Sequence, residues 1–136
     1  MGIRNFIMDG SLSVYVFGEY DETLAAAFDG AKDYFLKENI LIADTPRHAD
    51  VLLVIPPIAD KNAKILRAFY DEMLAPKYVV CADTKRSREK YRSYALINDL
   101  RRIIPVNTEC QIDRQKGKEN LINAFARIKE MIRNDG

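Results

Sequence analysis

The sequence predicts an α/β protein with a mostly parallel sheet. Segments that alternate or are wholly apolar, as strands are, take turns along the chain with segments whose apolar residues recur at helical spacing. The run Val51–Ile55 is apolar at every position, which is typical of a strand that helices cover on both faces. With 136 residues, the chain is expected to form one domain, residues 1–136, that buries a core without disulfides or a structural metal.

The first half of the chain supplies three of the expected strands and two helices. Residues 12–17 alternate and stop at Gly18, as a strand does, residues 40–43 form a short second strand, and residues 51–55 form the third. Two sets of apolar residues recur at helical spacing: Leu24, Phe28, Ala31 and Phe35 in one helix that runs to Lys37, and Leu66, Phe69 and Met73 in the helix that returns from the third strand. Pro76 ends this return.

The second half repeats the strand–helix unit twice. Residues 78–82 are expected to form the fourth strand and residues 106–110 the fifth. The accompanying helices are marked by Tyr91, Tyr94, Ala95 and Leu100, and by Leu121, Phe125, Ile128 and Ile132. Repeated units of this kind connect through right-handed crossovers. The sequence therefore predicts a three-layer, flavodoxin-like fold with a mostly parallel five-stranded sheet in the order 2-1-3-4-5.

The charge balance argues against a nucleic-acid partner. Lys and Arg total 21 against 20 Asp and Glu, which gives no general attraction to nucleic acid or to an anionic membrane. The basic stretch 85–92 is interrupted by Glu89 and lacks aromatic residues in a stacking pattern. It therefore favours a solvated helix start or a patch that faces a protein partner.

The composition predicts a cytoplasmic protein. No apolar run approaches the roughly 20 residues that span a bilayer, and the first ten residues lack the apolar core of a signal peptide. The two cysteines show no paired metal-ligand spacing, and a reducing compartment fits them best. We expect the protein in the cytoplasm, free or peripheral to a membrane complex on the cytoplasmic face.

Ligands of such sheets bind beyond the carboxyl ends of the strands. The loops expected there are residues 18–23, 44–48, 56–62, 83–88 and 111–118. The first has one glycine and three acids, whereas a phosphate cradle needs several glycines and no facing negative charge. A phosphoacceptor domain of this fold needs an Asp at the end of the third strand, but that strand ends in Ile55, Pro56 and Pro57, which argues against this function. The single histidine, His48, lies in a polar turn beside Arg47, where a structural role is favoured.

Several blocks of residues resemble one family in order and spacing. The segment 45–55 reads Thr-Pro-Arg-His-Ala-Asp followed by the third strand, and the segment 76–80 reads Pro-Lys-Tyr-Val-Val. Further matches are Asn62, Ala63, Leu66, Tyr70, Met73, Pro105, Val106, Glu119, Leu121 and Ile122. These blocks lie within residues 44–132, about two thirds of the chain. They resemble the B subunit of NADH:quinone oxidoreductase (complex I) and the related small subunit of membrane-bound nickel–iron hydrogenases.

The resemblance implies a domain that carries one 4Fe–4S cluster next to a large catalytic subunit. Such a cluster is held by cysteine thiolates, which in the family follow the first, fourth and fifth strands. The matching loops here contain no cysteine. The residues that stand in the vacated loops are Tyr20, Thr23, Lys85, Asp113 and Arg114. We therefore expect no cofactor and no metal.

The two cysteines do not replace the missing ligands. Cys81 is expected in the core of the fourth strand, where a free cysteine behaves as a small apolar residue. Cys110 is expected at a strand end, about three residues before the family's ligand. Lys85, Arg86 and Arg114 in the vacated loops suggest that ion pairs fill the emptied pocket, because buried charges persist when they are paired.

Three hypotheses of function remain open. The first is a cluster-less paralogue that acts as a non-catalytic structural or assembly component of a membrane-associated redox complex, beside a large hydrogenase-like or complex I-like subunit. The second is a module that binds a small anion through Lys85, Arg86, Arg114 and Arg47, with His48 as a further ligand or partner candidate. The third retains electron transfer through an iron–sulfur cluster held by both thiolates and by Asp113 or His48. No catalytic residue is predicted.

Overall fold

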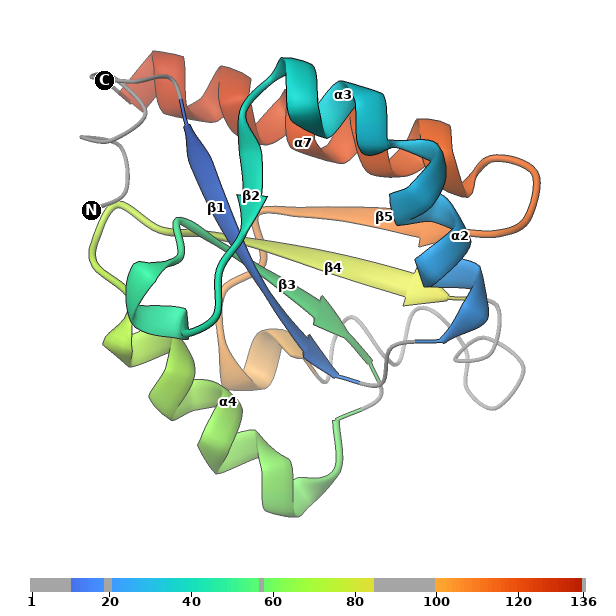
Figure 1. Cartoon of the computed structure of the whole chain (residues 1–136). Coiled ribbons are helices and arrows are strands. Elements are labelled where there is room, and N and C mark those ends of the chain that lie inside the picture. The colour runs from blue at the N-terminus through green and yellow to red at the C-terminus, as the bar shows by residue number, and fades with distance from the viewer. Residues whose placement is uncertain (1–10, 19–20, 57, 85–99, 136) are drawn as a thin grey trace.

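The computed structural model describes residues 11–18, 21–56, 58–84 and 100–135 and places five parallel strands in one sheet (Figure 1). Their order is β2-β1-β3-β4-β5, so the predicted fold class and strand order are confirmed. The strands are β1 (Leu12–Gly18), β2 (Ile40–Ile42), β3 (Val51–Ile55), β4 (Tyr78–Thr84) and β5 (Thr108–Ile112). The helices are α2 (Glu22–Gly30), α3 (Lys32–Lys37), the 3₁₀ helix η1 (Pro46–His48), α4 (Asp60–Glu72) and α7 (Gly117–Asp135).

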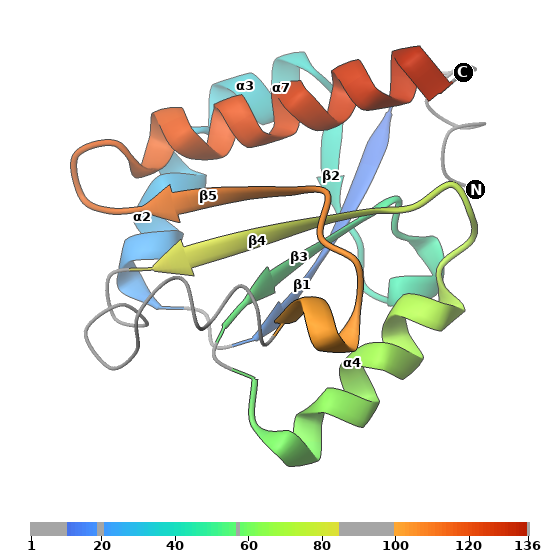
Figure 2. The ribbon, with the colours of Figure 1, turned by 180° about the vertical axis from the view of Figure 1, so that it is seen from behind.

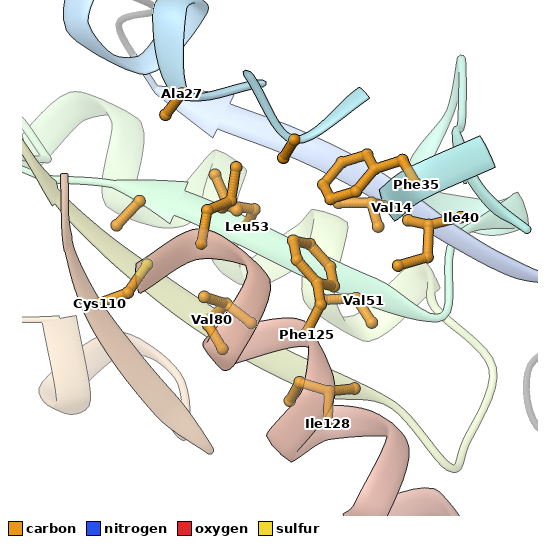
Figure 3. Close-up of a cluster of buried hydrophobic side chains, with 14 of the residues drawn as sticks. Val14, Ala27, Phe35, Ile40, Val51, Leu53, Val80, Cys110, Phe125 and Ile128 are labelled. Carbon is orange, nitrogen blue, oxygen red and sulfur yellow. The ribbon is translucent and has the colours of Figure 1, made fainter. Parts of the chain in front are cut away.

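Helices cover both faces of the sheet. Figures 1 and 2 show α2, α3 and α7 on one side and α4 on the other, together with a helical turn at residues 100–103. On the α7 side, Phe35 and Phe125 point toward the strand residues Val14 and Val51 (Figure 3). The two aromatic rings meet edge to face with centroids 5.2 Å apart. This larger of the two buried clusters joins α2, α3 and α7 to the sheet.

A second buried cluster lies between the sheet and α4. Leu52 and Val54 of β3 point into it and pack with Leu66 of α4 and with Met73, the residue that directly follows this helix. The intervening residues of β3 point into the cluster on the α7 side. Both faces of β3 are therefore covered, as the wholly apolar sequence of this strand predicted.

The first predicted helix is two helices in the structure. Ala31 has φ −90° and ψ 3°, outside the helical region, and separates α2 from α3. Glycine destabilises a helix, and Gly30 stands directly before the break. The buried residues Leu24, Ala31 and Phe35 nevertheless join one cluster, because both short helices pack on the same side of the sheet. The apolar periodicity therefore predicted the packing and missed the break.

The last two strands are displaced from their predicted bounds. β4 continues to Thr84, and β5 begins at Thr108 and ends at Ile112, two residues later than expected. Asn107 accounts for the late start. Its backbone N–H donates to the Val79 carbonyl (2.9 Å) while its side-chain Oδ1 accepts from the Val79 N–H (2.7 Å). The Asn107 side chain thus occupies a position in the ladder that strand backbone takes elsewhere.

Two predicted features fall outside the described residues. Of the predicted third helix, only Leu100 is described, in the turn at residues 100–103, and the basic stretch 85–92 is not described at all. In the parts of the chain that the structure describes, no helix combines the length and the apolar character needed to cross a bilayer.

Candidate functional site

Four strands bring their carboxyl ends to one edge of the sheet. Gly18 of β1 pairs with Ile55 of β3, and Thr84 of β4 pairs with Ile112 of β5. The segments that follow these four strands therefore leave the sheet on the same side, which is where ligands of this architecture bind. Four of the five predicted functional loops start from this edge.

The fifth predicted loop, residues 44–48, does not belong to this edge. β2 has three residues, and its last, Ile42, lies beside Val14 near the start of β1. The chain then passes through η1 and enters β3 at Val51, which also pairs with Val14. Arg47 and His48 in η1 are exposed near the amino end of the sheet. The expectation that they join the carboxyl-edge loops is wrong, because β2 is too short to carry them there.

A pocket of about 300 Å³ opens at the carboxyl edge between α2 and the segment that joins β5 to α7. Its lining consists of Glu22, Thr23, Ala26, Ala27, Asp113, Arg114 and Lys118. The structure thus brings together three residues predicted for the vacated cluster site, Thr23, Asp113 and Arg114. Tyr20, Lys85 and Arg86, which were predicted with them, lie outside the described residues.

Two charged residues of the pocket were not named as site candidates from the sequence. Glu22 lies in the first turn of α2 and Lys118 in the first turn of α7. The two helices are neighbours, and the Lys118 side chain lies beside Gly30. Both residues occur inside predicted loop boundaries or next to them, but only the packing of α2 against α7 brings them to one cavity.

Two carboxylates at this edge serve as helix caps. Asp21 Oδ1 accepts a hydrogen bond from the Leu24 N–H at the start of α2 (2.8 Å). Asp113 Oδ1 accepts from the N–H groups of Gln115 (3.0 Å) and Lys116 (2.6 Å) ahead of α7. Such caps satisfy amide groups that have no partner within the helix and place negative charge at the positive end of its dipole. Both carboxylates therefore perform a structural task at the edge where the family resemblance places thiolates.

The two thiols lie in the core, on opposite faces of the sheet. Cys81 lies in the core within β4, as predicted, in the cluster on the α4 side, and Cys110 belongs to the cluster on the α7 side. Figure 3 shows Cys110 beside the core strand β4. Cys110 is the third of five residues in β5, so its expected place at a strand end is wrong. The side chains of adjacent residues in paired strands alternate between faces, and this alternation separates the two sulfur atoms.

Burial keeps both thiols protonated. It raises the pKa of Cys81 from its ordinary value of 9.0 to about 12, and the Asp83 carboxylate acts in the same direction. Burial raises the pKa of Cys110 to about 12 as well, against the opposing charge of Arg127. Since the thiolate is the form that binds metal, neither cysteine is prepared to be a ligand.

The donor set does not fit a cluster held by thiolates. The chain has two cysteines and one histidine, and none of them lies in the residues that the structure leaves undescribed. Within the described ranges no three His, Cys, Asp or Glu side chains gather as they would around a metal ion. Cys81 and Cys110 face opposite sides of the sheet, so neither Asp113 nor His48 completes a set with both of them in this arrangement.

The predicted ion pairs of the emptied pocket are tested only for Arg114. The ion pairs between described residues join Arg67 to Asp71, Arg101 to Glu109 and Lys129 to Glu38, none of which includes Arg114. Lys85 and Arg86 are not described. The filling of the pocket by ion pairs therefore stays a prediction for these two residues.

Comparison with known proteins gives consistent relatives. The chain is 30% identical to the B subunit of NADH-quinone oxidoreductase from Rhodococcus opacus over 141 aligned positions, which cover 96% of this chain and 72% of that protein. It is 28% identical to the same subunit of Flavobacterium johnsoniae, covering 86% of this chain and 62% of that protein. It is 31% identical to the same subunit of Mycolicibacterium smegmatis, covering 77% of this chain and 59% of that protein. The chain thus spans about 60% of the length of the last two relatives. No protein-family model matches the chain.

A solved structure supports the fold. A chain of the membrane-bound sulfane sulfur reductase (MBS), an archaeal respiratory membrane complex, superposes with a TM-score of 0.70 at 20% identity. The match covers 97% of this chain and 76% of that chain. At this identity the likeness concerns the architecture alone.

Proposed function

The chain belongs to the family of the NADH-quinone oxidoreductase B subunit, and on this basis we propose that it is a non-catalytic structural or assembly component of a membrane-associated redox complex. In this proposal the protein carries no 4Fe–4S cluster. Its partner is a large hydrogenase-like or complex I-like subunit, and it resides in the cytoplasm or peripherally on the cytoplasmic face of the membrane.

The chemistry of the carboxyl edge carries the proposal. Soft thiolates hold iron–sulfur clusters, whereas the described residues of this edge offer hard carboxylates, ammonium and guanidinium groups. Asp21 and Asp113 are moreover engaged as helix caps. The scaffold on which the resemblance places a cluster is therefore present without donors suited to one.

Iron content tests the absence of the cluster. We would express the protein anaerobically with iron and sulfide supplied, then measure iron, labile sulfide and visible absorption, with a Cys81→Ala/Cys110→Ala variant alongside. The proposal expects substoichiometric iron that is the same in both proteins. Stoichiometric iron with a charge-transfer band, lost in the variant, would refute it and favour electron transfer through unusual ligands.

Copurification tests membership of a complex. A tagged chain, expressed from its native locus and isolated in mild detergent, is expected to bring subunits of one redox complex in fixed stoichiometry. Recovery of the chain alone, with the complex intact in a separate fraction, would contradict a structural role. An assembly factor is distinguished from a structural subunit by its absence from the mature complex.

Binding of a small anion is the second candidate, because Arg114 and Lys118 line the carboxyl-edge pocket. The same pocket presents Glu22 and Asp113, and Asp113 occupies the N–H groups that an anion would need. Arg47 lies near the other end of the sheet. A thermal-shift screen with phosphate and citrate tests this candidate. Stabilisation that disappears in Arg114→Glu/Lys118→Glu would support it, and no shift with either anion would reject it.

A further inference from the structure

One crossover of the sheet lacks the helix that its neighbours have. The connections from β1 to β2 and from β3 to β4 carry α2 with α3, and α4, respectively. The connection from β2 to β3, residues 43–50, carries only η1 (Figure 1). A doubly wound sheet buries both of its faces under helices. On the side of α4, the β1–β2 half of this sheet is therefore left without a crossover helix of its own.

The uncovered half presents an apolar strip. Tyr15 and Phe17 of β1 are half-buried, and their rings meet Phe69 of α4 edge to face with centroids 5.7 and 5.5 Å away. Leu41 pairs with Ser13, which places its side chain on the same face as Tyr15, and it is 55% exposed. Ile65 precedes Phe69 by one helical turn and is 46% exposed. We call these five residues the β1–β2 strip.

Neighbouring elements do not close the strip. The other flank of α4 faces the turn at residues 100–103, where Arg67 donates to the Ile103 carbonyl (3.2 Å). α2, α3 and α7 cover the opposite face of the sheet. The far edge of the sheet is protected, because Arg127 and Asn120 of α7 donate to the β5 carbonyls of Glu109 and Gln111. The described residues thus leave the β1–β2 half of the α4 side open.

Charge at the amino end of the strip indicates what would lie on it. η1 packs beside α4 and carries two exposed side chains, the cation Arg47 and the imidazole of His48. A crossover helix of a parallel sheet runs opposite to the strands, so its carboxyl end lies at this amino end. Cations complement the carboxyl end of a helix and any acidic residues in its last turn.

We infer that the β1–β2 strip is a docking surface for an amphipathic α-helix supplied by another subunit of the complex. Its apolar stripe packs on Leu41, Ile65 and Phe69, and its acidic carboxyl end meets Arg47 and His48. The partner thus supplies in trans the helix that the crossover lacks. The inference rests on the proposed membership of a complex, and it assigns Arg47 and His48 to recognition of a protein.

Site-specific crosslinking tests the geometry. A photoreactive residue replaces Leu41 or Ile65 in the chain within its native complex, and Leu36, 66% exposed in α3 on the opposite side of the sheet, serves as the control position. Crosslinked peptides are identified by mass spectrometry. Both strip positions are expected to reach one segment of another subunit with apolar residues three or four apart and acids at its carboxyl end. Crosslinks to residues 1–10 of the same chain, to a second copy, or to the peptides that Leu36 also reaches would overturn the inference.

Substitution tests the energetics. Leu41→Asp/Ile65→Asp is expected to reduce recovery of the assembled complex by about tenfold or more, while the isolated chain keeps its circular dichroism and melting temperature. Leu36→Asp is expected to leave assembly unchanged. If the wild-type chain copurifies with the complex and the double variant assembles normally, the β1–β2 strip is not a docking surface. Failure of the wild type to copurify would instead reject the proposed function.

Discussion

At the scale of single residues, the carboxyl edge depends on one glycine. Gly18 has φ +125°, a region that side chains with Cβ rarely adopt. A Cβ atom there would lie 2.5 Å from the Ile55 carbonyl oxygen and 2.9 Å from the Ile55 Cβ. The close approach of β1 to β3 at this edge therefore requires Gly18, whether or not a ligand binds nearby.

Gly18→Ala is expected to lower the free energy of unfolding by about 3 kcal/mol, from backbone strain and the clash with Ile55. Urea unfolding followed by circular dichroism measures the change. Gly30→Ala is the matched control, because a Cβ there meets only the flexible Lys118 side chain, at 3.2 Å. Equal stability of the two variants would show that β1 and β3 can separate at this edge without cost.

The buried thiols predict a loss of stability at alkaline pH. A group whose pKa is raised from 9.0 in the unfolded chain to about 12 in the folded chain contributes its full stabilisation below pH 9. This contribution to the free energy of unfolding falls as the pH rises from 9 to 12. Each thiol is expected to lower the free energy of unfolding by on the order of 1 kcal/mol at pH 10. Tyr34, whose pKa is raised by burial and by Glu38, adds a similar dependence.

Unfolding at a series of pH values measures this loss, with Cys81→Ala/Cys110→Ala as the comparison. The variant retains Tyr34, so the difference in slope between the two proteins reports the thiols alone. A thiol reagent at pH 8 is expected to leave both cysteines of the folded chain unmodified. Parallel pH profiles would mean that the thiols ionise as readily in the folded chain as in the unfolded one.

At the scale of elements, the side chain of one lysine, Lys77, binds the carboxyl end of α4. Lys77 Nζ donates to the carbonyls of Tyr70 (2.6 Å) and Met73 (3.4 Å) and lies 4.0 Å from the centroid of the Tyr70 ring. Carbonyls in the last turn of a helix lack partners within it, and a cation complements the negative end of its dipole. Lys77 therefore fixes the end of α4 and the entry into β4.

Lys77→Met is expected to destabilise the protein by about 1–2 kcal/mol through loss of these hydrogen bonds and of the cation–π contact. Lys64→Met, an exposed position of the same helix, is the control and is expected to be nearly neutral. Hydrogen exchange localises the effect. Faster exchange confined to the carboxyl-terminal turn of α4 fits the assigned role, and a uniform change along the chain argues for a different one.

At the scale of the whole molecule, the two edges of the sheet differ. Beyond β5, Arg127 Nη2 donates to the Glu109 carbonyl (3.0 Å) and Asn120 Nδ2 to the Gln111 carbonyl (2.8 Å). Arg127 Nε also donates to the Thr108 hydroxyl (2.8 Å). Side chains that already donate to these carbonyls stand where an added strand would have to pair. α7 thus protects β5 from association, whereas β2 at the other edge has only three residues.

Asn120→Ala/Arg127→Ala is expected to open the β5 edge and to produce concentration-dependent self-association. Sedimentation velocity across a range of concentrations would detect it. Glu130→Ala, an exposed change on the same helix, controls for altered surface charge. A double variant that sediments as the wild type does would show that other features protect this edge.

Part of the candidate site was predictable from the chain alone. Thr23, Asp113 and Arg114 were assigned to one place by the family resemblance, and the rule that loops after parallel strands meet at a common edge agrees with this assignment. Arg47 and His48 were misplaced because the same rule assumes strands of similar length, and β2 ends after three residues. Glu22 and Lys118 were missed because their convergence depends on how α2 packs against α7.

The fold class, the strand order and the absence of a full thiolate set followed from the amino-acid sequence, because periodicity and residue chemistry are local properties that one chain displays directly. Which residues share a surface depended on tertiary packing. That packing placed the two cysteines on opposite faces, separated Arg47 from Arg114, and left the β1–β2 strip uncovered by the described residues. These outcomes depend on strand lengths, register and helix packing, which are set by contacts between residues far apart in the chain.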